Sequence, residues 1–111
     1  MYLELEESQL KEKFLPIGSV VILKDATKRI MVTGYLSVDE NNKEKVYDYN
    51  GCVYPEGFLS SEQVLLFNHD QIDKVFFEGM RDEEQKSFAQ RLNEFAKKQE
   101  NSQKKIESLE E

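Results

Sequence analysis

The sequence predicts an α+β fold, in which a small bent antiparallel sheet, or a partly open SH3-like barrel, carries a long C-terminal helix. Short β-branched runs separated by turn residues fill the middle of the chain. A capping pattern followed by apolar residues at helical spacing opens the last third. The 111 residues give room for one domain. We expect a helical segment at 1–14, a single domain at 15–96 and a charged helical or frayed tail at 97–111.

The first elements are a short helix and a hairpin. Leu3 and Leu10 lie near helical spacing among charged residues, which predicts an amphipathic helix that Pro16 ends. Residues 19–24 and 29–36 then form two β-branched runs joined by four turn residues. This pattern predicts a β-hairpin that is apolar on both faces.

A second hairpin is predicted around Asn50-Gly51, because both positions tolerate the positive φ that a two-residue turn requires. The polar residues 39–45 before it are expected to form a loop. The turn would stack tyrosines across the two strands. The predicted pairs are Tyr49 with Cys52 and Tyr47 with Tyr54.

The later elements are two short strands, at 64–67 and 74–78, and a helix. Capping patterns precede each of them, at 60–63, 68–71 and 82–85. In the helix, the spacing of Phe88, Leu92 and Phe95 predicts a narrow apolar stripe that packs on the sheet. The predicted core consists of Val20, Ile22, Ile30, Val32, Leu66, Val75 and Phe77.

Charge and composition restrict the partners. The net charge of −7 argues against nucleic acid, whose phosphates require clustered Lys and Arg. A single cysteine forms no internal disulfide, and the acidic N-terminus does not resemble a signal peptide. The longest apolar run, Val20–Leu23, is too short for membrane insertion. We therefore expect a cytoplasmic protein.

Residues suited to catalysis or metal binding are few. One histidine and one cysteine do not supply the three or four ligands of a zinc site, and no glycine-rich phosphate loop is present. We expect no cofactor, no metal and no enzymatic activity. The alternative is a small enzyme that uses Asp48, Tyr49 and His69, which requires a pocket that joins all three.

Two segments are candidates for partner binding. The turn Tyr54–Phe58 contains aromatic residues that no periodicity explains. The apolar stripe of the helix is unfinished and needs a partner surface to cover it. The alternative for the tyrosines is cross-strand packing in the core. The candidate binding residues are Tyr54, Pro55, Glu56, Gly57, Phe58, Phe88, Leu92 and Phe95.

Four blocks of sequence resemble one family. They are Leu15–Lys24, Lys28–Gly34, Tyr47–Gly57 and Phe67–Gly79. The chain resembles a small family of domains of unknown function from Firmicutes, whose members are encoded beside LXG-type toxins of the type VIIb (Esx-like) secretion system.

This resemblance implies a cytoplasmic targeting factor or chaperone. Its partner would be the helical N-terminal domain of the toxin, often together with a small WXG-like helical protein. No catalytic residues of the family can be transferred to this chain. An immunity-like protein that neutralises a toxin domain is the alternative, and the oligomeric state stays open.

Overall fold

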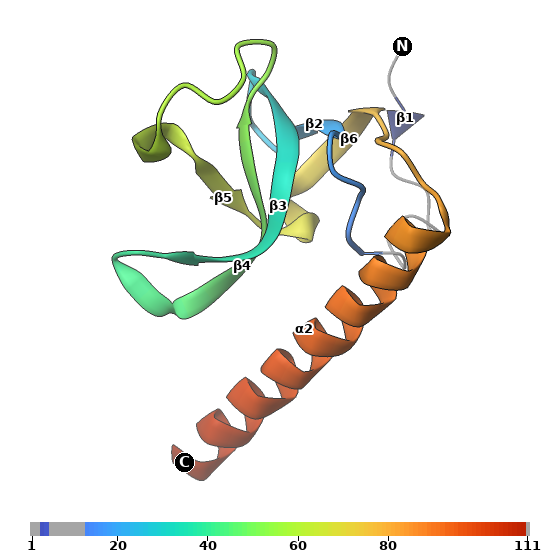
Figure 1. The fold of residues 1–111 in the computed structure, drawn as a ribbon. Coiled ribbons are helices and arrows are strands. Elements are labelled where there is room, and N and C mark those ends of the chain that lie inside the picture. The colour runs from blue at the N-terminus through green and yellow to red at the C-terminus, as the bar shows by residue number, and fades with distance from the viewer. Residues whose placement is uncertain (1–2, 5–12, 111) are drawn as a thin grey trace.

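The structure is a computed structural model that describes residues 3–4 and 13–110, with the side chains of residues 13–41 and 43–98. This part of the chain forms an antiparallel sheet of six strands and a long helix, α2 (Glu83–Glu110) (Figure 1). The strands are β1 (Leu3–Glu4), β2 (Val20–Leu23), β3 (Arg29–Asp39), β4 (Asn42–Val53), β5 (Leu65–Phe67) and β6 (Ile72–Phe77). Their order is β1-β6-β2-β3-β4-β5, so the sheet is open, with β1 and β5 at its edges. The predicted α+β class with a bent, unclosed sheet is confirmed.

The first predicted hairpin is confirmed as β2 and β3. Val20 pairs with Met31 and Val21 pairs with Ile30. The other edge of β2 pairs with β6, so this apolar strand lies inside the sheet. Val20 and Val21 point to opposite faces and are both buried, so both faces of β2 are covered at its start.

The second predicted hairpin is wrong. No turn forms at Asn50-Gly51, because β4 runs through both residues. Tyr49 pairs with Tyr35 and Cys52 with Met31, in place of Tyr49 with Cys52. Tyr47 likewise pairs with Ser37 and not with Tyr54.

Gly51 serves a close approach within the sheet. A Cβ atom at Gly51 would lie 2.7 Å from Ile30 Cγ2 and 2.7 Å from the Met31 carbonyl oxygen. Only glycine allows this contact between β4 and β3. Glycine is therefore present here because the two strands pack closely, and not because the chain turns.

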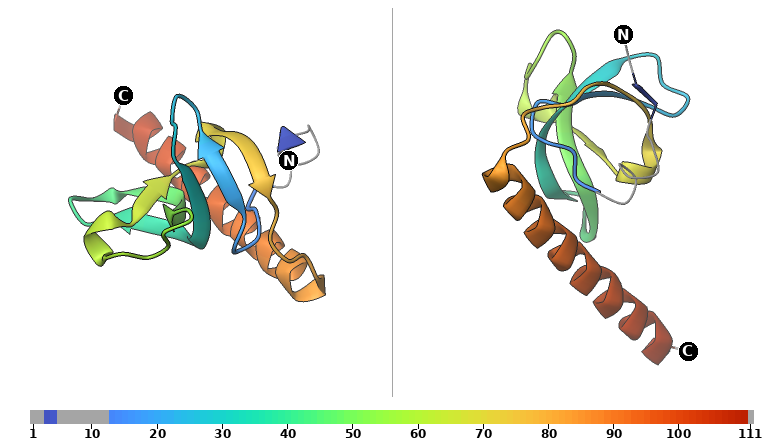
Figure 2. Two further views of the ribbon diagram at one scale, coloured as in Figure 1. Left: turned by 90° about the horizontal axis from the view of Figure 1, so that it is seen from above. Right: turned by 90° about the vertical axis from the view of Figure 1, so that its right-hand side faces the viewer.

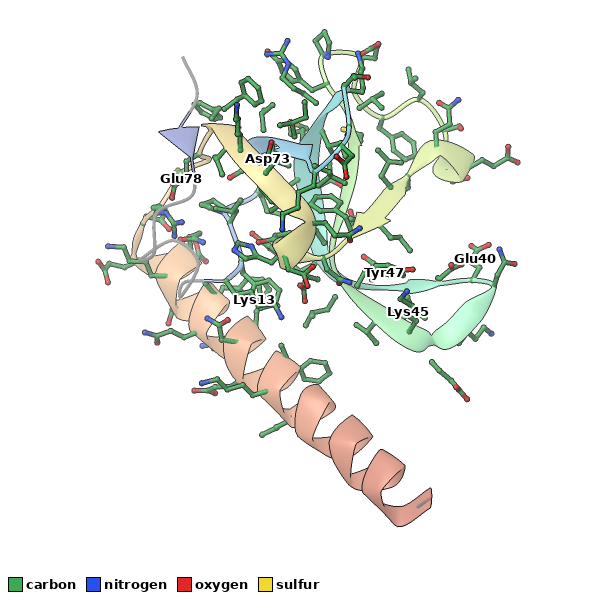
Figure 3. All side chains as sticks on the ribbon, turned by 180° about the vertical axis from the view of Figure 1, so that it is seen from behind. Lys13, Glu40, Lys45, Tyr47, Asp73 and Glu78 are labelled. Carbon is green, nitrogen blue, oxygen red and sulfur yellow. The ribbon has the colours of Figure 1, made fainter. Side chains whose placement is uncertain are left out.

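The turn between β3 and β4 lies in the polar segment 39–45 that was predicted to be a loop, but Asp39 still belongs to β3 and residues 42–45 already belong to β4. The Asn41 backbone N–H donates to Asp39 Oδ1 at 2.9 Å, as in an Asx turn. The two strands form a long arm here, with Glu40 at its tip and Lys45 and Tyr47 along it (Figure 3). Lys45 Nζ lies 5.0 Å from the centre of the Tyr47 ring.

Strands β5 and β6 lie where they were predicted, although β6 begins earlier, at Ile72. Between them is the 3₁₀ helix η2 (His69–Gln71), which has the predicted capping box. The Asn68 backbone N–H donates to Gln71 Oε1 at 2.7 Å. A second 3₁₀ helix, η1 (Ser61–Gln63), precedes β5. The side chain of Ser60 forms no capping hydrogen bond there, in contrast to the predicted capping pattern.

Helix α2 begins after Asp82, whose Oδ1 accepts a hydrogen bond from the Gln85 N–H at 2.8 Å. Leu92 and Ala96 are buried in the core. Phe88 and Phe95 are each 49% exposed, so they are not buried with Leu92 as predicted, although the Phe88 ring still contacts Tyr35 of β3. Leu92 and Ala96 face the core, and this orientation places the larger rings of Phe88 and Phe95 on the flank of the helix.

The helix crosses one side of the sheet and continues beyond it (Figure 2). It stays helical through the predicted tail, as far as Glu110. At about 1.5 Å per residue, the helix is roughly 40 Å long. The longest extent of the molecule, 47 Å, is of the same order.

The core lies between the inner face of the sheet, residues Phe14–Pro16 and the first half of α2. Its cluster of buried residues is Phe14, Leu15, Val21, Ile30, Val32, Tyr49, Phe67, Ile72, Val75, Leu92 and Ala96. Of the predicted core, Val20, Ile30, Val32 and Val75 are buried, and Ile22 and Leu66 are half-buried. Phe77 is 61% exposed, which contradicts the prediction. A register shift between Val20 and Val21 in the β2–β6 pairing interrupts the alternation before this residue.

The N-terminal region differs from the predicted helix where the structure describes it. Leu3–Glu4 is the edge strand β1, which pairs with Lys74 and Val75 of β6. Residues 5–12 of the predicted helical segment lie outside the described residues. Phe14 is fully buried with its ring 5.7 Å from that of Tyr35.

Candidate docking surfaces

The turn at Tyr54–Phe58 follows β4 and is exposed. It begins with a cis peptide bond between Tyr54 and Pro55. Lys28 Nζ donates to Glu56 Oε2 at 2.8 Å and holds the turn against the β2–β3 loop. Phe58 is 67% exposed, and the neighbouring Leu59 is also exposed. We call Tyr54, Phe58 and Leu59 the turn surface.

Tyr54 also borders a shallow groove of about 440 Å³ that contains an arginine between two aromatic rings. The Arg29 guanidinium lies 4.9 Å from the Tyr54 ring centre and 5.2 Å from that of Phe76. Both distances are in the range of cation–π contacts. The guanidinium is therefore already engaged within the protein.

The aromatic residues of α2 form a second exposed surface. Phe88 and Phe95 are seven residues apart, which places them two turns apart on one face of the helix. Phe88 contacts Tyr35 of β3, with ring centres 6.0 Å apart. Leu92, the third predicted binding residue, is buried and faces the core.

Phe88 forms one wall of a larger groove at the beginning of α2, with a volume of about 830 Å³. Besides Phe88, its apolar lining comes from three other parts of the chain. Ile17 precedes β2, Tyr35 lies on β3, and Met80 lies between β6 and α2. The polar lining consists of Asp82, Glu83, Glu84, Gln85, Ser87 and Arg91. We call this site the helix-start groove.

Backbone contacts fix the walls of the helix-start groove. The Gly79 N–H donates to Ser19 Oγ at 3.0 Å. A Cβ atom at Gly79 would lie 2.1 Å from the Ile17 carbonyl oxygen, so only glycine lets the two segments touch. The Tyr35 hydroxyl donates to the Leu15 carbonyl oxygen at 2.6 Å and holds the ring in the floor.

The two predicted binding segments are not brought together. The turn surface lies at the end of β4 that is remote from α2 (Figure 1). Ile17 and Met80, the most exposed apolar residues of the helix-start groove, were not predicted. Each is a single apolar residue in a loop, where periodicity gives no signal.

The residues of the alternative enzyme, Asp48, Tyr49 and His69, do come together. The Tyr49 hydroxyl lies 2.7 Å from His69 Nδ1 and accepts a hydrogen bond from the Leu15 N–H at 3.0 Å. The His69 N–H donates to Asp48 Oδ2 at 2.8 Å. Lys13 Nζ forms an ion pair with Asp48 Oδ1 at 3.0 Å. Figure 3 shows Lys13 beside α2.

The two ring side chains of this polar cluster are closed to solvent, whereas Lys13 and Asp48 are partly exposed and line a small pocket that includes neither ring. Tyr49 is fully buried and His69 is 6% exposed. Burial raises the pKa of the Tyr49 hydroxyl above its ordinary value, and it lowers the pKa of the His69 ring. Both groups are therefore neutral near pH 7. We interpret the cluster as a structural one, whose hydrogen bonds and ion pair attach residues Lys13–Leu15 to the sheet.

His69 Nε2 is buried without a hydrogen-bond partner among the described residues. We assign Tyr49 as the donor to Nδ1, because its oxygen already accepts from Leu15. This assignment leaves the ring hydrogen on Nε2. Protonating Nδ1 would disrupt the arrangement.

Among the described residues, no group of three or more His, Cys, Asp or Glu side chains is placed to hold a metal ion. Within the same part of the chain, no helix has the length and apolar character needed to cross a membrane.

The residues that form the sheet and the beginning of α2 match a known family. The match, to a domain of unknown function (DUF4176), covers residues 14–88. The chain belongs to the DUF4176 family. The DUF4176 region contains β2–β6, the turn surface and the apolar lining of the helix-start groove, whereas Phe95 lies beyond it. No curated protein and no solved structure matches the chain.

Proposed function

We propose that this DUF4176 protein is a non-enzymatic accessory factor of type VIIb secretion. It binds the helical N-terminal domain of an LXG-type toxin in the cytoplasm and directs it to the secretion apparatus. The observation that carries the proposal is the exposed aromatic face of α2, where Phe88 and Phe95 are half-exposed while Leu92 is buried. The sequence resemblance to proteins encoded beside such toxins supplies the identity of the partner.

The exposed face of α2 has the spacing that a helical partner requires. Apolar side chains separated by seven residues can pack against the stripe of a second helix. The helix-start groove extends this surface with Ile17 and Met80, which are 52% and 74% exposed. Contiguous exposed apolar surface of this kind marks interaction sites in proteins that are stable as monomers.

The burial of Tyr49 and His69 in the polar cluster supports a non-enzymatic role. A catalytic base or nucleophile must reach the substrate, directly or through one water molecule. The Tyr49 hydroxyl is surrounded by Leu15 and His69 and is fully buried. Its hydrogen bonds go to groups of the protein itself, so they serve the fold.

The test is co-expression of the full chain with each half of an adjacently encoded LXG-type toxin. We expect the protein to co-purify with the helical N-terminal domain, and deletion of its gene to reduce toxin export. Binding only to the toxic C-terminal half, with protection of cells by this protein alone, would replace the proposal with an immunity role. Export that is unchanged by the deletion would contradict the proposal.

A further inference from the structure

We propose that the helix-start groove is the docking site, and that its occupant is an amphipathic α-helix with Lys or Arg residues beside its apolar stripe. This inference rests on the proposed function and adds to it the site and the chemistry of the partner segment. Three features of the groove carry it: an apolar floor, an acidic rim and a fixed shape.

The apolar floor suits the side chains of a helix. Ile17, Met80 and Phe88 are all about half-exposed or more, and they converge from three segments on one concave surface. The volume of about 830 Å³ exceeds what one or two apolar side chains fill. A row of anchors at positions i, i+3 or i+4 and i+7 would cover all three residues.

The rim of the groove is acidic at the beginning of α2. Asp82, Glu83 and Glu84 supply three carboxylates, and Arg91 supplies one guanidinium farther along the helix. Asp82 Oδ1 is used in capping, and Glu83 forms only a distant pair with Lys86, at 3.9 Å. The negative rim therefore attracts a segment that carries positive charges next to its apolar stripe.

The groove is preformed. The contact of Gly79 with Ile17 and Ser19 sets the path of the chain between β6 and α2, and therefore the position of Met80. The hydrogen bond from Tyr35 to the Leu15 carbonyl fixes the floor. A rigid site loses less conformational entropy on binding than a flexible one.

The turn surface lacks this charge complementarity. Its basic residue Lys28 is paired with Glu56, and Arg29 is engaged by two aromatic rings. Arg29 keeps its positive charge in these contacts, and the carboxylate of Glu56 is paired, so a basic partner would find no unpaired carboxylate among them. The observations therefore favour the helix-start groove over the turn surface.

The first test is site-specific photo-crosslinking in the full chain, with the helical N-terminal domain of the toxin as the probe. A photoreactive amino acid replaces Met80 in one variant and Phe58 in another, because both are highly exposed. We expect a crosslink to a toxin helix from position 80 and none from position 58. A crosslink from position 58 alone would overturn the groove as the docking site while leaving the proposed function intact.

The second test measures association kinetics at low and high salt. We expect Glu84→Lys to lower the association rate about tenfold at low salt, with the difference shrinking at high salt. The matched control is Glu62→Lys, at an exposed glutamate in η1, which should stay within about twofold of the unmodified protein. Circular dichroism confirms that both variants are folded.

Equal losses for the two variants would overturn the charge complementarity of the groove, because they would reflect only the overall charge of the protein. Met80→Asp provides an independent readout and should raise the Kd about tenfold or more, since it places a charge in the apolar floor. An unchanged Kd would overturn the site. Absence of binding by the unmodified protein would instead overturn the proposed function and this inference with it.

Discussion

The hydroxyl of Tyr49 lies 2.7 Å from Nδ1 of His69, and this contact joins β4 to η2 inside the protein. The same hydroxyl accepts the Leu15 N–H, so one side chain holds three segments that are distant in sequence. Phe14, which is adjacent to Leu15, belongs to the core cluster that also contains Leu92 of α2. The polar cluster thus helps to form the platform on which α2 lies.

Removing the hydroxyl should destabilise the protein. Tyr49→Phe leaves the buried Leu15 N–H and His69 Nδ1 without a partner, and each unsatisfied group costs about 1–3 kcal/mol. Urea denaturation should show a lower free energy of unfolding by an amount in that range or above. The control Tyr47→Phe, on a half-buried tyrosine of the β3–β4 arm, should change it by less than about 0.5 kcal/mol. Equal effects would contradict the structural role of the cluster.

Stability should fall as the pH decreases through the range in which histidine titrates. Burial lowers the pKa of His69 from its ordinary value of 6.5, so the unfolded chain binds a proton that the folded protein resists. The stabilising contribution is present above that value and is lost as the pH falls below it. His69 is the only histidine, so His69→Gln should flatten the change in unfolding free energy between about pH 7.5 and about pH 5.5. A slope that persists in this variant would contradict the assignment.

The two faces of α2 should respond differently to truncation. Leu92→Ala removes a buried side chain and should reduce the free energy of unfolding by about 2–4 kcal/mol. Phe95→Ala removes a half-exposed ring and should cost less than about 1 kcal/mol. Thermal and urea unfolding of the two variants measure this difference. A larger cost at Phe95 would mean that the helix is rotated relative to the structure.

Gly79→Ala should disturb the junction between β6 and α2. The added methyl group would lie 2.1 Å from the Ile17 carbonyl oxygen, so the backbone must move. We expect a loss of about 1–3 kcal/mol of stability and weaker binding of the toxin domain. Gln90→Ala, at an exposed residue of α2 outside the helix-start groove, should leave both unchanged. Stability equal to that of the unmodified protein would show that this contact does not fix the groove.

Local sequence signals predicted the parts of the fold that they determine. The capping box at Asn68–Gln71, the start of α2 at Asp82 and the β2–β3 hairpin each depend on residues close in sequence. Asn50-Gly51 led to the wrong prediction of a turn. Glycine is required at position 51 because Ile30 and Met31 of the neighbouring strand lie too close for a side chain. Such a contact cannot be seen in a single sequence.

The candidate site was predicted only in part. Phe88 and Phe95 were identified as binding residues, but the helix packs through Ala96 and Leu92, so the aromatic residues are on its flank. A small residue such as Ala96 gives a weak hydrophobic signal even where it is buried in the core. Ile17 and Met80 meet in the groove only because Gly79 brings their segments together, and this is a tertiary effect.

The affinity of the full chain for the helical N-terminal domain of the toxin, measured by isothermal titration calorimetry, tests the central claim most directly. We predict a one-to-one complex whose Kd rises about tenfold or more in the double variant Phe88→Ala/Phe95→Ala. The control Leu59→Ala, at an exposed apolar residue of the turn surface, should leave the Kd unchanged. Unaltered binding by the double variant would show that the exposed face of α2 is not the docking surface, and absence of binding by the unmodified protein would contradict the account as a whole.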